Sequence, residues 1–276
     1  MDPNTHNSRR RLVRAAVYGV ATVAILAVGV TQLLLDDGEA RCPGPCKPPP
    51  FEAAWTYQLQ GTPPITRARV YDVDGFDTPA SFVSRLHRFG RYAVCYISAG
   101  TWEDWRPDRD RFPDSVLGRG NGWPGERWLD IRRMDVLTPI MRDRISICKS
   151  KGFDAVEPDN VDGFTNDTGF PLTDRDQIRY NKRLALLAHT AGLAVGLKND
   201  LEQVTALRND FDFAVVEQCF QYQECGKLVP FLDAGKPVFE VEYELPRSSF
   251  CDRARKLRIN AQRTNVDLSK VGAACR

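Results

Sequence analysis

Eight short apolar segments that alternate with helix-like segments constrain the fold of this chain more than any other feature. Strands of this length, separated by helical stretches, are typical of βα units that build a parallel sheet. Eight such units close into a barrel. The predicted strands cover residues 53–59, 69–75, 91–98, 153–160, 193–200, 211–218, 236–243 and 257–262. The sequence therefore predicts an α/β protein with a (β/α)8 TIM barrel.

Helix-like segments lie between these strands. They cover residues 78–90, 137–152, 174–192 and 201–210. Thr78 is the expected N-cap of the first helix and Gly90 its stop signal.

Polar residues occupy the end of one alternating face in seven of the predicted strands. Residues two apart in a strand share a face. If these faces point inward, their last residues meet at the C-terminal mouth of the barrel, where barrel enzymes place their chemistry. These residues are Gln58, Asp74, Tyr96, Asp159, Lys198, Glu217 and Glu242.

The segment FDAVEPDNVDG, residues 153–163, places Glu157, Asp159 and Asp162 within six residues. One acid at a strand end is often only a turn or capping residue. The agreement of seven strand ends favours a site instead. Glu157 lies deeper, and a buried carboxylate needs a partner such as Lys198. Glu157 is therefore either a structural ion-pair member or a site residue.

The first 50 residues differ from the rest. Four arginines precede an uncharged run over residues 15–35, which at about 1.5 Å per residue is long enough to cross a bilayer as a helix. We expect residues 1–40 to be a signal peptide or a signal anchor, and both remain open. Residues 41–50 are expected to be a proline-rich linker, and residues 51–276 the folded domain. That domain is expected to be secreted or extracytoplasmic, touching a membrane only through residues 15–35 if they are not cleaved.

The eight cysteines suit disulfide formation in an oxidising compartment. Cys95 and Cys148 either pair or remain buried thiols. Two further pairs are plausible, namely Cys219–Cys225 and Cys251–Cys275. No CxxC pair occurs and the three histidines are scattered, so no metal site is expected. The net charge of +2 gives no sign of a nucleic-acid surface.

Seven motifs follow one another from about Trp55 to the C-terminus: WTYQLQG, YDVDGFD, CYISAGTWEDWRPD, EPDNVDGF, GLKND, VVEQCFQYQEC and VFEVEY. Together they resemble bacterial and fungal glycoside hydrolase family 114, the endo-α-1,4-polygalactosaminidases. The resemblance implies a (β/α)8 barrel that cleaves galactosaminogalactan-type polymers with retention. Carried over by motif, the catalytic residues are Asp159 of EPDNVDG and Glu217 of VVEQCF.

Glycoside hydrolysis typically uses two carboxyl groups with opposed tasks. One strand lies between those that end in Asp159 and Glu217, so their backbones should be about 10 Å apart at ~4.8 Å per strand. We assign Asp159 as nucleophile because its shorter side chain is held more firmly. Glu217, which follows an apolar run, is assigned as general acid/base, although the reverse stays open. Asn160 and Lys198 are expected to keep Asp159 ionised.

The acids at the predicted mouth should attract a cationic ligand, such as the ammonium group of deacetylated galactosamine. We expect Asp74, Asp162 or Glu242 to receive it. The remaining expected substrate-binding residues are Gln58, Tyr96, Trp102, Asn160 and Lys198.

The long connection after the third strand contains four of the five tryptophans: Trp102, Trp105, Trp123 and Trp128. They either stack on sugar rings or pack the loop onto the barrel. Trp123, between a glycine and a proline, is the one expected to be exposed.

Two other functions fit the same residues. A metal-assisted barrel lyase or isomerase would use the carboxylates as Mg²⁺ ligands and Lys198 as base. A non-catalytic barrel would bind polysaccharide without cleaving it. The convergence of site groups favours the hydrolase, as a monomer that needs no cofactor and acts on a polysaccharide.

Overall fold

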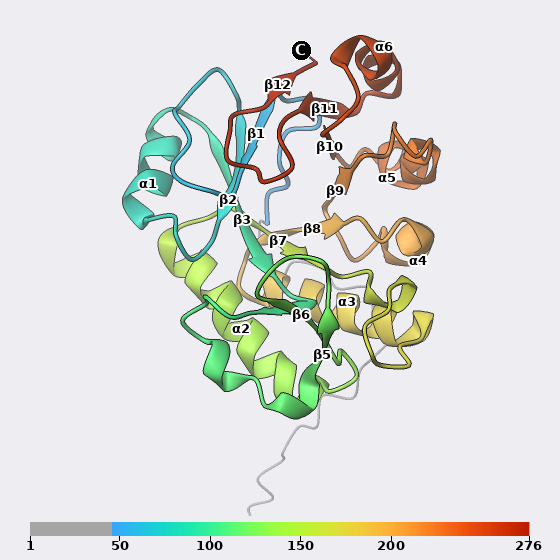
Figure 1. Cartoon of the computed structure of the whole chain (residues 1–276). Helices are drawn as coiled ribbons and strands as arrows, with labels where there is room; N and C mark the ends of the chain where they lie inside the picture. Colours follow the sequence, from blue (N-terminus) through green and yellow to red (C-terminus); the bar gives the residue numbers. More distant parts are fainter. Residues whose placement is uncertain (1–45, 276) are drawn as a thin grey trace, which may run out of the picture. The chain divides into compact units, whose positions relative to one another are not determined.

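The computed structural model describes residues 46–275, and all eight predicted strands are present there (Figure 1). They are β1 (Trp55–Gln58), β2 (Val70–Asp74), β3 (Tyr92–Ser98), β7 (Ala155–Asp159), β8 (Ala194–Lys198), β9 (Phe213–Glu217), β10 (Val238–Glu242) and β11 (Asn260–Arg263). Each pairs in parallel with the next. The predicted (β/α)8 barrel is therefore confirmed.

Helices connect the strands and cover the outside of the sheet (Figure 1). The α-helices are α1 (Ala80–Arg88), α2 (Met134–Lys151), α3 (Asp174–Thr190), α4 (Val204–Leu207), α5 (Val229–Asp233) and α6 (Arg247–Leu257). Short 3₁₀ turns are η1 (Arg109–Arg111), η2 (Asp114–Val116), η3 (Gly163–Thr165), η4 (Leu201–Gln203) and η5 (Cys225–Leu228). The connection after β3 adds a small antiparallel sheet of β4 (Thr101–Glu103), β5 (Leu117–Gly120) and β6 (Glu126–Leu129).

Local sequence explains where the main helices begin and end. Thr173 and Asp176 form a reciprocal capping box at the start of α3. Gly152 follows α2 with a φ of 89°, a conformation that glycine adopts without steric cost. The expected cap at Thr78 is wrong by one position, because Pro79 occupies the N-cap of α1 and no side chain caps that helix.

The barrel is not closed by strand pairing between β11 and β1. The chain instead continues past β11 to the antiparallel strand β12 (Ala273–Ala274). On the way, the carbonyl oxygen of Leu268 accepts hydrogen bonds from the backbone N–H of Leu59 and Gln60, at 3.0 and 3.3 Å. The Asn260 side chain accepts from the backbone N–H of Ala53 and donates to the carbonyl of Phe51, both at 2.9 Å. These contacts join the last strand to the first.

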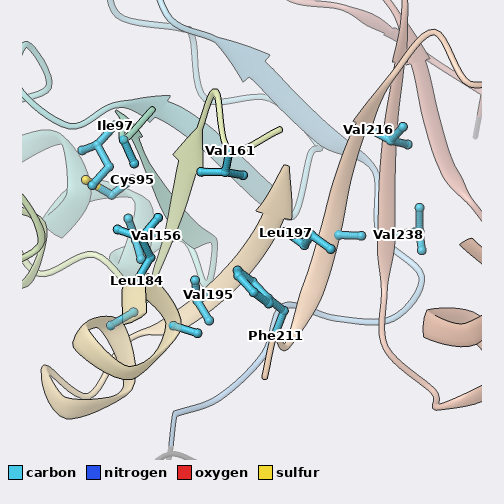
Figure 2. Close-up of a cluster of buried hydrophobic side chains, with 14 of the residues drawn as sticks. Cys95, Ile97, Val156, Val161, Leu184, Val195, Leu197, Phe211, Val216 and Val238 are labelled. Atoms are coloured by element: carbon cyan, nitrogen blue, oxygen red, sulfur yellow. The ribbon is translucent and has the colours of Figure 1, made fainter. Parts of the chain in front are cut away.

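Two layers of apolar side chains support the barrel. The outer layer lies between strands and helices and includes Val156, Val195 and Leu184 of α3, which gather on one side of β7 and β8 (Figure 2). Each such side chain contributes about 1.5–3 kcal/mol when fully buried. The inner layer fills the barrel and includes Trp55, Phe213 and other bulky residues. The strands are thus buried on both faces.

The predicted inward face is correct for five strands and wrong for two. On β2, β3, β7, β8 and β9, the inner layer takes the residues of the expected alternating set. On β1 and β10, it takes Trp55 and Tyr57, and Phe239 and Val241. Strand register agrees, because Tyr57 lies opposite Asp72. Gln58 and Glu242 therefore occupy the opposite face from the one expected.

Three disulfides have both of their cysteines within residues 46–275: Cys95–Cys148, Cys219–Cys225 and Cys251–Cys275. Both plausible pairs are confirmed, and the alternative for Cys95 and Cys148 is decided in favour of pairing. Cys95–Cys148 joins β3 to α2.

The predicted N-terminal signal or anchor, residues 1–40, lies outside the described residues. Within residues 46–275, none of the helices is both long enough and apolar enough to cross a bilayer. Residues 46–50 contain no helix or strand.

Candidate active site

A cavity of about 440 Å³ opens at the C-terminal ends of the barrel strands. Seven of the expected site residues line it: Asp74, Tyr96, Asp159, Asn160, Asp162, Lys198 and Glu217. Gln58, Trp102 and Glu242 are not among the lining residues. Eight acidic residues line the cavity against two basic ones, Arg106 and Lys198. The cavity is thus shaped for a ligand with positive charge.

Lys198, at the end of β8, is the centre of the cavity floor. Its side chain is only 1% exposed, and its Nζ lies 3.1 Å from Glu157 Oε1, 3.1 Å from Asp159 Oδ1 and 3.7 Å from Glu217 Oε2. Burial alone would lower the pKa of Lys198, but the charges of these three carboxylates raise it well above its usual value. One permanent cation therefore holds three acids from β7 and β9.

Asp159 is fixed on both of its oxygens. Oδ2 accepts a hydrogen bond from Tyr96 Oη at 2.8 Å, and Oδ1 accepts from the backbone N–H of Asn160 at 2.8 Å. Asn160 has a φ of 62°, which asparagine tolerates better than most residues, and this turns its N–H toward the carboxylate. Burial, then the charge of Asp159, raises the pKa of Tyr96 well above its usual value. Tyr96 therefore remains a hydrogen-bond donor at neutral pH.

Glu217 is held at the end of β9 by two residues that the sequence did not single out. Oε2 accepts from Asn199 Nδ2 at 3.1 Å, and Asn199 Oδ1 accepts in turn from the Glu217 backbone N–H at 3.0 Å. Tyr243 Oη donates to Oε1. The surroundings of this carboxyl group are thus polar, although the strand that carries it is apolar.

Tyr57 also approaches the floor of the cavity. Its hydroxyl accepts from Lys198 Nζ at 2.8 Å and donates to Glu157 Oε1 at 3.2 Å. Burial, then the charge of Glu157, raises the pKa of Tyr57 well above its usual value. Tyr57 and Tyr243 were missed because the inward face of their strands was assigned wrongly. Their bulk is the signal that could have found them, since bulky side chains fill barrel interiors.

The other expected acids differ in whether another side chain already pairs with their carboxylate. Asp74 is paired through both oxygens with Arg106, at 3.0 and 2.7 Å, and Arg106 also binds Glu103. By contrast, the Asp162 carboxylate has no side-chain hydrogen bond or ion pair among the described residues. Burial, followed by the charge of Asp159, raises the pKa of Asp162 to about 6.

The three expected residues outside the cavity make local contacts. Gln58 Nε2 donates to the carbonyl of Gln60 at 2.8 Å. Glu242 Oε1 accepts from the backbone N–H of Phe220 and Gln221 at 2.9 and 3.1 Å, so it anchors the loop after β9. Trp102 packs against the outer core, and its Nε1 donates to the carbonyl of Arg109.

Two tryptophans at the rim are half exposed. Trp105 is 49% exposed and Trp123 50%, and both line the cavity. Trp128 also lines it but is buried. The expectation that Trp123 is exposed is confirmed, while Trp102 and Trp128 serve mainly in packing.

No group of three or more His, Cys, Asp or Glu in residues 46–275 is arranged to hold a metal ion. The acids of the cavity floor converge instead on the Lys198 ammonium. An arrangement of carboxyl groups at a barrel mouth with a fixed cation is suited to acid–base and nucleophilic chemistry.

Known proteins are similar to this chain in sequence and fold. The profile of glycoside-hydrolase family GH114 matches residues 38–276. The crystal structure of Ega3 from Aspergillus fumigatus in complex with galactosamine is 36% identical and has a TM-score of 0.79, over 83% of this chain and 97% of that chain. The glycoside hydrolase domain of PelA from Pseudomonas aeruginosa shares the fold at 15% identity, with a TM-score of 0.64, over 80% of this chain and 98% of that chain. No match was found among curated proteins.

The motif resemblance noted in the sequence is therefore confirmed over nearly all of the described chain. The protein is a glycoside hydrolase, and it belongs to glycoside-hydrolase family GH114.

Proposed function

We propose that this protein is a retaining hydrolase of polysaccharides that contain α-1,4-linked galactosamine and N-acetylgalactosamine, with Asp159 and Glu217 as its catalytic pair. The observation that supports this most strongly is that both carboxylates contact the same Lys198 Nζ, at 3.1 and 3.7 Å, so their facing oxygens lie at most about 6.8 Å apart. Retaining enzymes need about 5–5.5 Å between the carboxyl groups, whereas inverting enzymes need about 6.5–9.5 Å. This bound on the facing oxygens is compatible with the retaining distance and supports retention.

The contacts of the two carboxylates support their separate roles. Asp159 has a cation and two donors around it, which stabilise its negative charge and fix its orientation, as a nucleophile requires. Glu217 is more exposed, at 28% against 16%, and so can exchange protons with substrate and water. Asp159 is therefore the nucleophile and Glu217 the general acid/base.

The reaction then has two steps. Asp159 attacks the anomeric carbon while Glu217 protonates the departing glycosidic oxygen, leaving a glycosyl ester on Asp159. Glu217, now ionised, takes a proton from water, which displaces Asp159 and restores the anomeric configuration. Lys198 and Tyr96 offset the charge that returns to Asp159 when the ester is cleaved.

The substrate follows from charge. The acidic lining favours a cationic sugar, and Ega3, at 36% identity, binds galactosamine in its crystal structure. Among the three acids expected to receive an ammonium group, Asp74 is paired with Arg106 and Glu242 is outside the cavity. Asp162 is the receptor that fits, because its carboxylate faces the cavity without a side-chain partner among the described residues.

Hydrolysis of partly deacetylated galactosaminogalactan, followed by mass analysis of the products, tests the proposal. Asp159→Asn and Glu217→Gln should each abolish cleavage, with azide restoring turnover in one of them. Asp267→Asn at the cavity rim is the matched control and should remain active. Full activity in either catalytic variant, or loss of activity in EDTA, would contradict the mechanism. Binding without any release of reducing ends would instead indicate a non-catalytic barrel.

The N-terminal region completes the proposal. Residues 1–40 direct export as a signal peptide or anchor, residues 41–50 form the linker, and residues 51–276 act outside the cytoplasm as a monomer. The disulfides Cys95–Cys148, Cys219–Cys225 and Cys251–Cys275 support an oxidising compartment. Mass analysis of the protein from its native source, with cell fractionation, distinguishes cleavage from anchoring, and light scattering of residues 51–276 tests the monomer.

A further inference from the structure

Two acids lie beneath the catalytic pair and take no part in the mechanism above. Asp72 of β2 is 1% exposed and Glu157 of β7 is 0% exposed. Both point into the barrel from the face that ends in Asp74 and Asp159. Carboxylates this deeply buried require compensation for the loss of water.

Only one of the two carboxylate oxygens of Glu157 has partners that compensate for the loss of water. Its Oε1 contacts Lys198 Nζ and the Tyr57 hydroxyl, whereas no N–H or O–H donor of the described residues reaches Oε2. Asp72 Oδ1 is in the same situation. The two carboxyl groups nevertheless lie close enough to each other for a hydrogen bond. Two ionised carboxylates have no proton to donate, so this contact needs a proton on one of them.

The charges around the pair lead to the same conclusion. Asp72 is surrounded by Glu157, Asp159 and Lys198, and Glu157 additionally by Tyr57. Were every acid ionised, Asp72 and the three carboxylates that contact Lys198 would share one ammonium group. One proton in the pair reduces this excess of negative charge.

We infer that Asp72 and Glu157 share a single proton, and that this pair, carrying one negative charge, positions Lys198 between Glu157 and the nucleophile Asp159. Asp72 donates, and Glu157 keeps its charge toward Lys198. The Lys198 ammonium group and the Tyr57 hydroxyl both contact Glu157 Oε1 and favour its charged form, so the proton belongs on Asp72. In agreement, burial, then the charge of Glu157, raises the pKa of Asp72 well above its usual value. The ammonium group lies equally far, 3.1 Å, from Glu157 and Asp159. Loss of the charge on Glu157 would draw Lys198 toward Asp159 and Glu217.

Asp72 is thus a positioning residue, and its kinetic effect rests on the proposed function. Asp72→Leu removes the donor, so Glu157 gains a proton more readily as the pH falls. We expect the acidic limb of the pH profile of kcat to move to higher pH by about one unit. We also expect kcat to fall by roughly ten- to a hundredfold, since small displacements of a reacting group have such effects. KM should change little. Asp72→Asn supplies an amide donor in the same place, and should keep most of kcat and the original acidic limb.

A control comes from a second buried pair, Glu240 and Glu242 on the outward face of β10, which are also hydrogen-bonded to each other. Glu240→Gln removes a buried acid at a distance from Lys198 and should leave the pH profile unchanged. The inference is overturned if Asp72→Asn is as impaired as Asp72→Leu, since a charge at Asp72 would then be required. The inference is equally overturned if Asp72→Leu leaves the acidic limb of the pH profile of kcat where it is in wild type. It is also overturned if Glu240→Gln moves that limb as far as Asp72→Leu does.

Infrared difference spectroscopy tests the shared proton without any assay of activity. At neutral pH the difference spectrum between wild type and Asp72→Asn should contain the band of one protonated carboxyl group, because the bands of other protonated acids, such as Asp200, occur in both proteins and cancel. A difference spectrum without this band would refute the shared proton. Because this measurement uses no substrate, it remains decisive even if the enzyme proves to cleave a different polymer, and it does not require Asp72→Leu to fold.

Discussion

Replacing Lys198 by methionine removes the ammonium group that Glu157, Asp159 and Glu217 share, while keeping a side chain of similar length. Removing one partner of a buried ion pair typically costs about 3–5 kcal/mol, because the remaining charge stays buried without compensation. Lys198 is 1% exposed and Glu157 0%, so solvent does not screen the lost interaction. We therefore expect the free energy of unfolding of Lys198→Met to be lower than wild type by about 3–5 kcal/mol at pH 8.

The deficit should shrink as the pH falls. In wild type the raised pKa of Lys198 means that its contribution is complete below its unfolded value of 10.5, and so is constant between pH 5 and 8. In the variant, the freed carboxylates have raised folded pKa values and take up protons as the pH falls, which favours the folded state. One proton taken up across these three pH units returns about 4 kcal/mol. Most of the deficit should therefore disappear at pH 5.

Urea unfolding followed by tryptophan fluorescence at pH 5 and pH 8 measures both values. Titration of Asp200 occurs in both proteins and cancels in their difference. The charge of Lys198 lowers the pKa of Asp162, so any extra proton that Asp162 takes up in the variant adds to the same pH dependence. Lys227→Met removes an exposed lysine that pairs with Glu202 and Glu224, and should cost less than about 1 kcal/mol at either pH. An equal deficit for Lys198→Met at the two pH values would refute the view that one buried cation balances these carboxylates.

Four other outcomes are expected. Asp162→Asn should raise KM more for partly deacetylated polymer than for fully acetylated polymer. It should also abolish the rise in KM that wild type shows as the pH falls through about 6, where Asp162 is protonated. Equal effects on both polymers would contradict the role of Asp162 as an ammonium receptor. Trp123→Ala should raise KM for long polymers by roughly tenfold, or ~1.4 kcal/mol, with little effect on short ones; an unchanged KM would assign Trp123 to packing. Tyr243→Phe should lower kcat by roughly 100-fold at constant KM, because Glu217 loses one of its two side-chain donors; an unchanged kcat would exclude this role. Burial, then the charge of Asp162, raises the pKa of Asp200 to about 8, so wild type loses stability as the pH rises from the unfolded pKa of about 4 to about 8, where only the unfolded state is ionised. Asp200→Asn lacks this loss and should be more stable than wild type in urea at pH 9 but not at pH 5; equal stability at pH 9 would refute the shift.

The fold could be predicted from sequence because parallel strands buried on both faces are continuous apolar runs. β8 and β9 are such runs, each bounded by residues of helices or turns. The strand order then follows from the chain order, since each βα unit adds the next parallel strand. The closure between β11 and β1 could not be predicted, because it depends on the Asn260 side chain and on Leu268, residues without a pattern of their own.

The face of a strand is a harder problem where both faces are buried. On β10, Glu240 and Glu242 point toward the helices and yet are 0% exposed, while Phe239 and Val241 fill the barrel. In a strand with one exposed face, polar residues indicate the solvent side and apolar residues the core side. This rule fails for a strand that is buried on both faces. The acids were assigned to the cavity for their chemistry, although the bulk of their neighbours fills the interior. The same error on β1 concealed Tyr57.

Depth in the barrel separates the acids by the roles proposed for them, and this explains the sequence of β7. Glu157 is completely buried, and a group without access to water is suited to holding a fixed charge against Lys198. Asp159, two residues further along the same face, is 16% exposed, which allows it to meet a substrate while still bound to Lys198. Glu217 is 28% exposed and can pass protons to and from water. A strand that ends in alternating acids can thus place a charge-holding group and a reactive group on one line toward the cavity. Exchanging Glu157 for glutamine should consequently disturb Asp159 through Lys198, although Glu157 itself has no access to the substrate.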